Sequence, residues 1–285
     1  MKIARIGVSF LLSFLFMMLL IVNELSLVTS STLLKNDYYT STLTQVGYYD
    51  YLGTEIEKEF INIGLATGLP KEVFENSISR KWLELQGNHY IAGLIDYLSL
   101  KTDTIRYEFD SKPLEAQFNQ TIVSYAKKMG MTVSKEDLTS VNALLINNVQ
   151  QRIIVVDPQN SLFPKMRHYT TLLVMSRGYL FFASLLILLC LFLVNKYKPY
   201  KFINWLAYSF ISTGFFIVIP SFILGISSVL NRLPLNDIYL RQAVGALLER
   251  YVSYTLYTGI ATIIVGILLV FASYYKNAPH SNNPC

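Results

Sequence analysis

Cysteine is almost absent from this sequence. Its 285 residues include only Cys190, inside an apolar run, and Cys285 at the C-terminus. Neither lies in the long polar segment between residues 26 and 176, so no disulfide can form there. An extracytoplasmic domain without disulfides is more typical of a bacterial protein than of a eukaryotic cell-surface protein.

Histidine is nearly as rare, with three residues, and the motifs of metal and cofactor chemistry are missing. The sequence has no HExxH motif, no cysteine cluster and no acid-rich calcium loop. It also lacks a GxSxG elbow, a phosphate-binding glycine loop and a dinucleotide fingerprint. We therefore expect no metal site and no cofactor, and the sequence favours a protein that is not an enzyme.

Four long apolar runs dominate the composition, in which 52% of the residues are hydrophobic and 15% are charged. A helix of about 20 apolar residues crosses the hydrocarbon core of a bilayer. We therefore predict an all-α integral membrane protein with four transmembrane helices, at about residues 6–27, 174–195, 203–229 and 251–275. The uncharged run of the first span ends before Glu24 and that of the second span begins after Arg177, so we expect no charged residue within these runs.

The orientation follows from basic residues near the span ends, which favour the cytoplasm. With the N-terminus inside, the short cytoplasmic pieces contain six basic residues and no acid: Lys2, Arg5, Lys196, Lys198, Lys201 and Lys276. The segment from 26 to 176, with 14 Lys or Arg and 16 Asp or Glu, then lies outside. This predicts a multi-pass protein of the cell membrane with both termini cytoplasmic. The net charge of +5 comes mostly from the basic residues in these cytoplasmic pieces, so it does not predict nucleic-acid binding.

Four parts follow from this topology. Residues 1–29 form an uncleaved transmembrane anchor, for which a cleaved signal peptide is the alternative. Residues 30–170 form an extracytoplasmic helical domain, and residues 171–276 a three-span membrane domain with a cytoplasmic tail at 277–285. Apolar residues at helical spacing and Gly, Pro and Ser punctuation predict the helices of the outer domain. These helices are expected at 37–46, 50–65, 71–76, 80–100, 113–130 and 136–153. A separate amphipathic helix is expected at 234–249, either in the outer interface or packed beneath the outer domain.

The clearest candidate for a catalytic site in the outer domain consists of Trp82, His89 and Asp96. Their spacing of seven residues places all three near one helix face. His89 and Asp96 are the candidate catalytic pair. Side chains two turns apart are about 10 Å apart along the axis, so a group from another helix would have to complete the site. The alternative is an ordinary surface histidine with Trp82 in the core.

Binding candidates are Trp82, the pair Tyr38 and Tyr39, and Arg177. The tyrosine pair suits either a ligand face or packing near the membrane, and Arg177 suits an anionic headgroup or an interfacial anchor. Small residues in the later spans, Gly214, Gly225, Gly259 and Gly266, are typical of helix packing in lipid.

These patterns predict a non-enzymatic component that senses, binds or scaffolds through its outer helical domain. Its expected partners are the lipid bilayer and another membrane protein or a second copy, with no nucleic acid. The layout is similar to that of claudin-like proteins, but the outer segment lacks their paired cysteines and is predicted to be helical. The alternatives are a membrane enzyme acting on lipid, lipoprotein or envelope polymer at the outer face, and a subunit of an oligomeric transporter or channel.

Overall fold

A computed structural model describes residues 2–67, 70–74, 77–130, 132–154, 162–196, 198–227 and 237–277. Every regular element in these ranges is a helix, which confirms the predicted all-α class. The chain forms two compact units. The membrane unit comprises Met1–Leu34, Thr171–Pro234 and Val244–Cys285, and the polar unit comprises Lys35–Thr170 and Leu235–Ala243.

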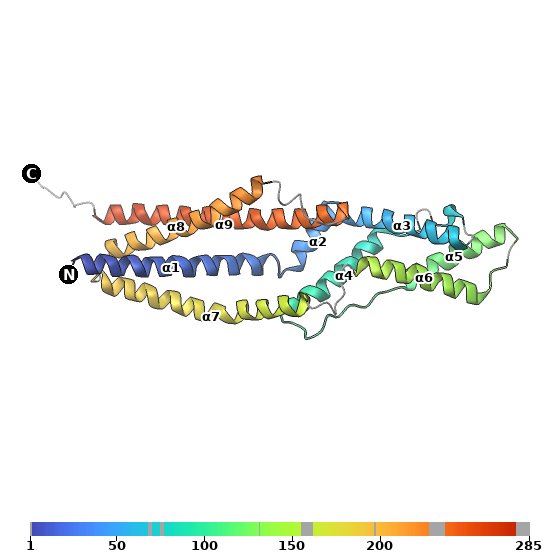
Figure 1. Ribbon diagram of the computed structural model, residues 1–285, viewed down its shortest axis with the longest axis horizontal. Coiled ribbons are helices and arrows are strands. Elements are labelled where there is room, and N and C mark those ends of the chain that lie inside the picture. The colour runs from blue at the N-terminus through green and yellow to red at the C-terminus, as the bar shows by residue number, and fades with distance from the viewer. Residues whose placement is uncertain are drawn as a thin grey trace, which may run out of the picture. The chain divides into compact units, whose positions relative to one another are not determined.

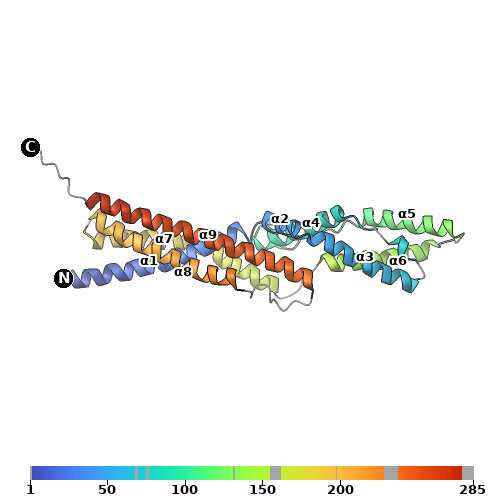
Figure 2. The same cartoon turned by 90° about the horizontal axis from the view of Figure 1, so that it is seen from above.

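Four helices are long and apolar enough to cross a membrane, as predicted. They are α1 (Lys2–Ser31), α7 (Leu162–Val194), α8 (Pro199–Ile226) and α9 (Ile238–Asn277). Within the membrane unit they run side by side (Figures 1 and 2). Helix α8 is about as long as its predicted span, whereas α1, α7 and α9 are much longer than theirs.

The structure corrects the expectation that Glu24 and Arg177 are flanking charges, because the apolar helices continue past both residues. Glu24 lies inside the apolar helix Ile3–Ser31, and Arg177 lies inside Phe163–Val194. Glu and Arg are good helix formers, so a single charge does not end a helix. The apolar pattern of α1 also resumes at once with Leu25, Leu27 and Val28.

The start of α9 corrects the prediction of a separate amphipathic helix at 234–249. From Ile238 these residues are the first turns of α9, and the same helix continues to Asn277. Asp237 caps it, because its Oδ1 accepts hydrogen bonds from the backbone N–H groups of Tyr239 and Leu240 at 2.8 and 3.2 Å. No proline interrupts the helix after this point. Residues 234–236 lie outside the described ranges.

The polar unit is built from helices that lie within two residues of the predicted ones: α2 (Asn36–Gln45), α3 (Tyr48–Thr67), α4 (Arg80–Leu98), α5 (Lys112–Lys128) and α6 (Lys135–Ile153). A short 3₁₀ helix, Lys71–Val73, stands where a helix at 71–76 was expected, and residues 75 and 76 are not described. Ser79 and Ser134 cap α4 and α6 by accepting hydrogen bonds from the N–H groups of Trp82 and Asp137.

An aromatic core holds the polar unit together. Phe60, Phe74 and Phe118 are completely buried, and the ring of Phe60 lies 6.2 Å from that of Phe74 and 5.2 Å from that of Phe118. Burying each ring stabilises the unit by roughly 1.5–3 kcal/mol. The first turns of α9 join this core through Ala243, which is 2% exposed.

Candidate functional site

His89 and Asp96 border the same hollow of about 460 Å³ on the polar unit, together with Arg106 and Glu108. The carboxylate of Asp96 pairs with Lys101, whose Nζ lies 2.7 Å from Oδ1. His89 is exposed, and within the described part of the chain no hydrogen bond joins it to Asp96. The structure therefore brings the two residues to one hollow but does not couple them as an acid–base pair.

Trp82 borders a different hollow, of about 430 Å³, with Leu85 and Asn88. Its ring packs edge-to-face on Phe109 with the centroids 5.6 Å apart. The indole Nε1 is buried and has no hydrogen-bond partner among the described residues. An indole N–H usually finds an acceptor when it is buried, so this unpaired donor is an exception. We call the hollow beside Trp82, Leu85 and Asn88 the Trp82 hollow.

Tyr38 and Tyr39 pack edge-to-face, with ring centroids 5.3 Å apart. Tyr38 is buried, and Tyr39 is partly exposed. Burial, followed by repulsion from Tyr38, raises the pKa of Tyr39 to about 12. The Tyr39 phenol is therefore neutral at physiological pH, and Tyr38 lies in the interior instead of on a ligand face.

Arg177 joins α7 to α1 within the membrane unit. Its Nε donates to Ser26 Oγ at 3.1 Å, and its Nη2 donates to the carbonyl oxygen of Ser26 at 2.9 Å and also to Ser30 Oγ. These bonds use donors of the guanidinium that would otherwise be available to a lipid headgroup.

Polar side chains along α1 contact all three other membrane helices, and we call them the α1 polar ladder. Such contacts are how polar groups are satisfied in lipid. The ladder pairs Ser9 with Asn195 (3.4 Å), Ser13 with Ser209 (2.7 Å), Asn23 with Ser184 (3.5 Å), Glu24 with Thr262 (2.7 Å), Ser26 and Ser30 with Arg177, and Thr29 with Tyr251 (3.1 Å).

Glu24 is the acidic member of this ladder. Its Oε1 lies 2.7 Å from the Thr262 hydroxyl, while its Oε2 is buried without a hydrogen-bond partner among the described residues. Thr262 lies near the middle of the uncharged stretch between Arg250 and Lys276. An ionisable residue inside an apolar helix is costly, so Glu24 is a candidate functional position. Sequence reasoning did not single out Glu24 because it took the charge as the flank of an uncharged run; the apolar residues that follow Glu24 were the signal.

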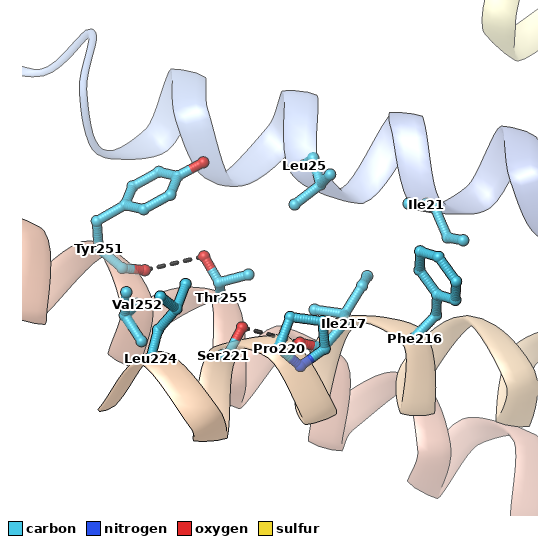
Figure 3. Close-up of a pocket in the computed structure, with 10 residues that line it drawn as sticks. All are labelled: Ile21, Leu25, Phe216, Ile217, Pro220, Ser221, Leu224, Tyr251, Val252 and Thr255. Atoms are coloured by element: carbon cyan, nitrogen blue, oxygen red, sulfur yellow. Dashed lines mark hydrogen bonds between the residues drawn. The ribbon is translucent and has the colours of Figure 1, made fainter. Parts of the chain in front are cut away.

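A cavity of about 280 Å³ lies between α1, α8 and α9 (Figure 3). Ile21 and Leu25 line it from α1, Pro220 from α8 and Tyr251 from α9. Its inner hydroxyls are already used: Thr255 donates to the Tyr251 carbonyl at 2.9 Å, and Ser221 donates to the Ile217 carbonyl at 2.8 Å. The cavity therefore presents an apolar surface, suited to a hydrocarbon chain.

Metal ligands do not gather in the part of the chain that the structure describes. No group of three or more His, Cys, Asp or Glu side chains in those residues is arranged to hold an ion.

Comparison with known proteins gives no match: no protein-family model, no curated protein and no solved structure is significantly similar to this chain. The functional argument therefore rests on the residues and contacts of the chain itself.

Proposed function

We propose that this chain is a non-enzymatic component of the cell membrane that displays its polar unit on the outer face, with both termini in the cytoplasm, and senses or binds a partner there. The charge bias of the sequence supports this orientation, because six basic residues and no acid lie in the pieces assigned to the cytoplasm. The expected partner is another membrane protein or a second copy of the chain.

One observation carries the sensing part of the proposal: α9 contributes residues to both units. Its first turns belong to the polar unit, where Ala243 is buried in the core and the Tyr239 ring stacks on Tyr51. The rest of α9 belongs to the membrane unit, where Thr262 contacts Glu24. A ligand that alters the packing around Ala243 therefore acts on a helix that also packs inside the membrane unit.

Hydrogen exchange tests this coupling in the full chain reconstituted in nanodiscs. Ala243→Trp overfills the polar core, whereas Gln242→Trp adds the same ring at an exposed position one residue away. We expect Ala243→Trp to speed amide exchange both in the polar unit and in α9 beyond Tyr251, and Gln242→Trp to do neither. A change that stops at Ala243 would contradict a sensing role.

The binding surface that we propose is the Trp82 hollow, beside which Leu85 is 51% exposed. A photo-crosslinking residue at Leu85 should capture a defined membrane partner or a second copy in intact cells. The same residue at Val123, which is 49% exposed on α5, is the matched control. Equal capture from both positions, or a strictly monomeric chain on native gels, would count against the proposal.

The topology itself is tested by labelling single cysteines in a chain with Cys190 and Cys285 replaced by alanine. Ser124→Cys, exposed on α5, should react with a membrane-impermeant thiol reagent in intact cells. Asn283→Cys should react only after the cells are opened. Labelling of Asn283→Cys first would invert the orientation and remove the basis for an outer binding domain.

A second candidate function is a membrane enzyme at the outer face, which one observation favours: His89 and Asp96 border one hollow with Arg106 and Glu108. In this case His89 would transfer protons on a lipid, lipoprotein or envelope polymer. The test is to incubate the reconstituted protein with membrane lipids and follow product formation by mass spectrometry. Turnover that is lost in His89→Ala would support this function over the first.

A further inference from the structure

The hydroxyl of Thr262 lies within hydrogen-bond distance of two oxygens. One is Oε1 of Glu24 at 2.7 Å, and the other is the backbone carbonyl oxygen of Thr258 at 3.0 Å. A hydroxyl has a single hydrogen to donate, and a carbonyl oxygen can only accept. A carboxylate at Glu24 would have to take this hydrogen from Thr258 or share it with the Thr258 carbonyl in a bifurcated bond. A protonated Glu24 can instead donate to the Thr262 oxygen, so both contacts are complete, unshared hydrogen bonds when Glu24 carries a proton.

The second carboxyl oxygen of Glu24 also favours the protonated form. Oε2 of Glu24 is buried and has no hydrogen-bond partner among the described residues. As the carbonyl of a neutral acid, this oxygen costs only what one unpaired acceptor costs. As part of a carboxylate it would carry charge in apolar surroundings, where the desolvation penalty is much larger.

The charged and titratable groups on the neighbouring helices do not stabilise a charged Glu24. From α7, Arg177 binds Ser26, which follows Glu24 by two residues and so lies on roughly the opposite side of α1, about 200° around the axis. From α9, the Tyr251 hydroxyl contacts Thr29, and Arg250 lies over the Tyr254 ring at 5.9 Å. The sequence of α8 has no charged side chain from Phe202 to Ile226, and Tyr208, its titratable group, is exposed.

We infer that Glu24 is a proton-binding site within the membrane unit. With the proton bound, the carboxylic acid donates to Thr262 and links α1 to α9. When the proton leaves for the solvent, Glu24 becomes a carboxylate, and Thr262 must turn its hydrogen from Thr258 to the charged oxygen or share it between the two. The α1–α9 contact then includes a desolvated charge and weakens. This site is independent of the binding role proposed for the polar unit.

Infrared spectroscopy of the full chain in nanodiscs tests the bound proton directly. We expect the carbonyl absorption of a protonated carboxylic acid at neutral pH, lost in Glu24→Gln and kept in Glu249→Gln, an exposed acid on the same helix α9 as Thr262. Thr262→Val should shift this absorption without removing it, because the acid then loses its acceptor, and Thr262→Ser should restore it. Absence of the absorption from the wild-type protein, or its survival in Glu24→Gln, would overturn the inference.

The pH dependence of stability provides a second test, because the inference predicts the direction of the change. The folded state holds a proton that Glu24 in the unfolded, solvated chain releases, so stability should fall as the pH rises through the neutral range. Glu24→Gln, a neutral mimic of the acid, should lose this component of the pH dependence of the melting temperature. Glu249→Gln should retain it. Parallel profiles for the wild type and Glu24→Gln would show that Glu24 does not bind the proton.

Discussion

Gly214 of α8 and Gly259 of α9 pack face to face. A Cβ added to Gly214 would lie 2.7 Å from the carbonyl oxygen of Gly259, and one added to Gly259 would lie 3.2 Å from that of Gly214. Gly266 repeats this one heptad later, since a Cβ there would lie 2.9 Å from the backbone nitrogen of Ile211. The three glycines thus form a close backbone contact between α8 and α9, as small residues do in membrane helices.

This contact predicts that Gly214→Ala and Gly259→Ala destabilise the membrane unit by about 1–3 kcal/mol through overpacking. In an open helix position the same change stabilises by about 1 kcal/mol, because alanine has the higher helix propensity. Gly178→Ala on α7 is the control, since no heavy atom lies within 4 Å of its Cβ position. Thermal unfolding in detergent measures all three, and equal shifts for all would contradict the close contact.

The ion pair between Arg80 and Glu57 should contribute more to the stability of the polar unit than the nearby pair Lys58–Glu55. Arg80 Nη2 lies 3.1 Å from Glu57 Oε2, and the Glu57 side chain is 16% exposed. Arg80→Ala leaves this half-buried carboxylate without its cation, so we expect a loss of about 1–3 kcal/mol. Urea unfolding followed by fluorescence gives the value.

The control for this prediction is the exposed pair Lys58–Glu55, whose Nζ and Oε1 are 2.6 Å apart. The Lys58 side chain is 63% exposed, so Lys58→Ala should destabilise the polar unit far less than Arg80→Ala. A loss for Lys58→Ala as large as for Arg80→Ala would show that burial does not separate the two pairs.

Gly93 on α4 allows the segment after this helix to pass directly over it. A Cβ at Gly93 would lie 2.1 Å from the backbone carbonyl oxygen of Arg106, which cannot turn away as a side chain would. Gly93→Ala should therefore displace the segment around Arg106 and open the hollow next to His89. Trypsin should then cleave after Lys101 and Arg106 several times faster, while Gly178→Ala leaves the rate unchanged. Unchanged cleavage would contradict this packing.

Tyr48 should make the stability of the polar unit depend on pH in the alkaline range. Desolvation, with a smaller effect from Asp237, raises its pKa from 10.0 to about 12, against a lowering by Arg152. The neutral phenol is favoured in the folded state, so its contribution is complete below pH 10 and is lost as the pH rises to about 12. Tyr48→Phe should reduce the loss of stability over this interval, measured by denaturant unfolding at each pH. An unchanged loss would assign it to other groups.

Local sequence signals were sufficient for much of the fold. Ser79 marked the start of α4, Pro113 the start of α5 and Gly130 its end, because caps and breakers act within a few residues. The four apolar helices followed from length and composition. The placement of the polar unit outside the cell stays a prediction.

The candidate site in the membrane unit could not be predicted in the same way. Glu24 and Thr262 are 238 positions apart in the chain, and periodicity contains no information about which helix faces which. The continuity of α9 was hidden for a related reason: residues 238–249 have an apolar side that suits an interface as well as a protein core. Only the tertiary contact of Ala243 with the polar core distinguishes the two.

The α1 polar ladder has a consequence for biosynthesis. Helix α1 ends at Ser31, and the part of α7 that belongs to the membrane unit begins at Thr171, so about 140 residues separate α1 from its first ladder partner. At about 5–20 residues per second, the ribosome needs on the order of ten seconds to make that stretch. Throughout this interval Asn23, Glu24 and Ser26 have no helix to pair with in the bilayer. The polar side chains of α1 therefore gain their interhelical partners only once α7, α8 and α9 have been synthesised.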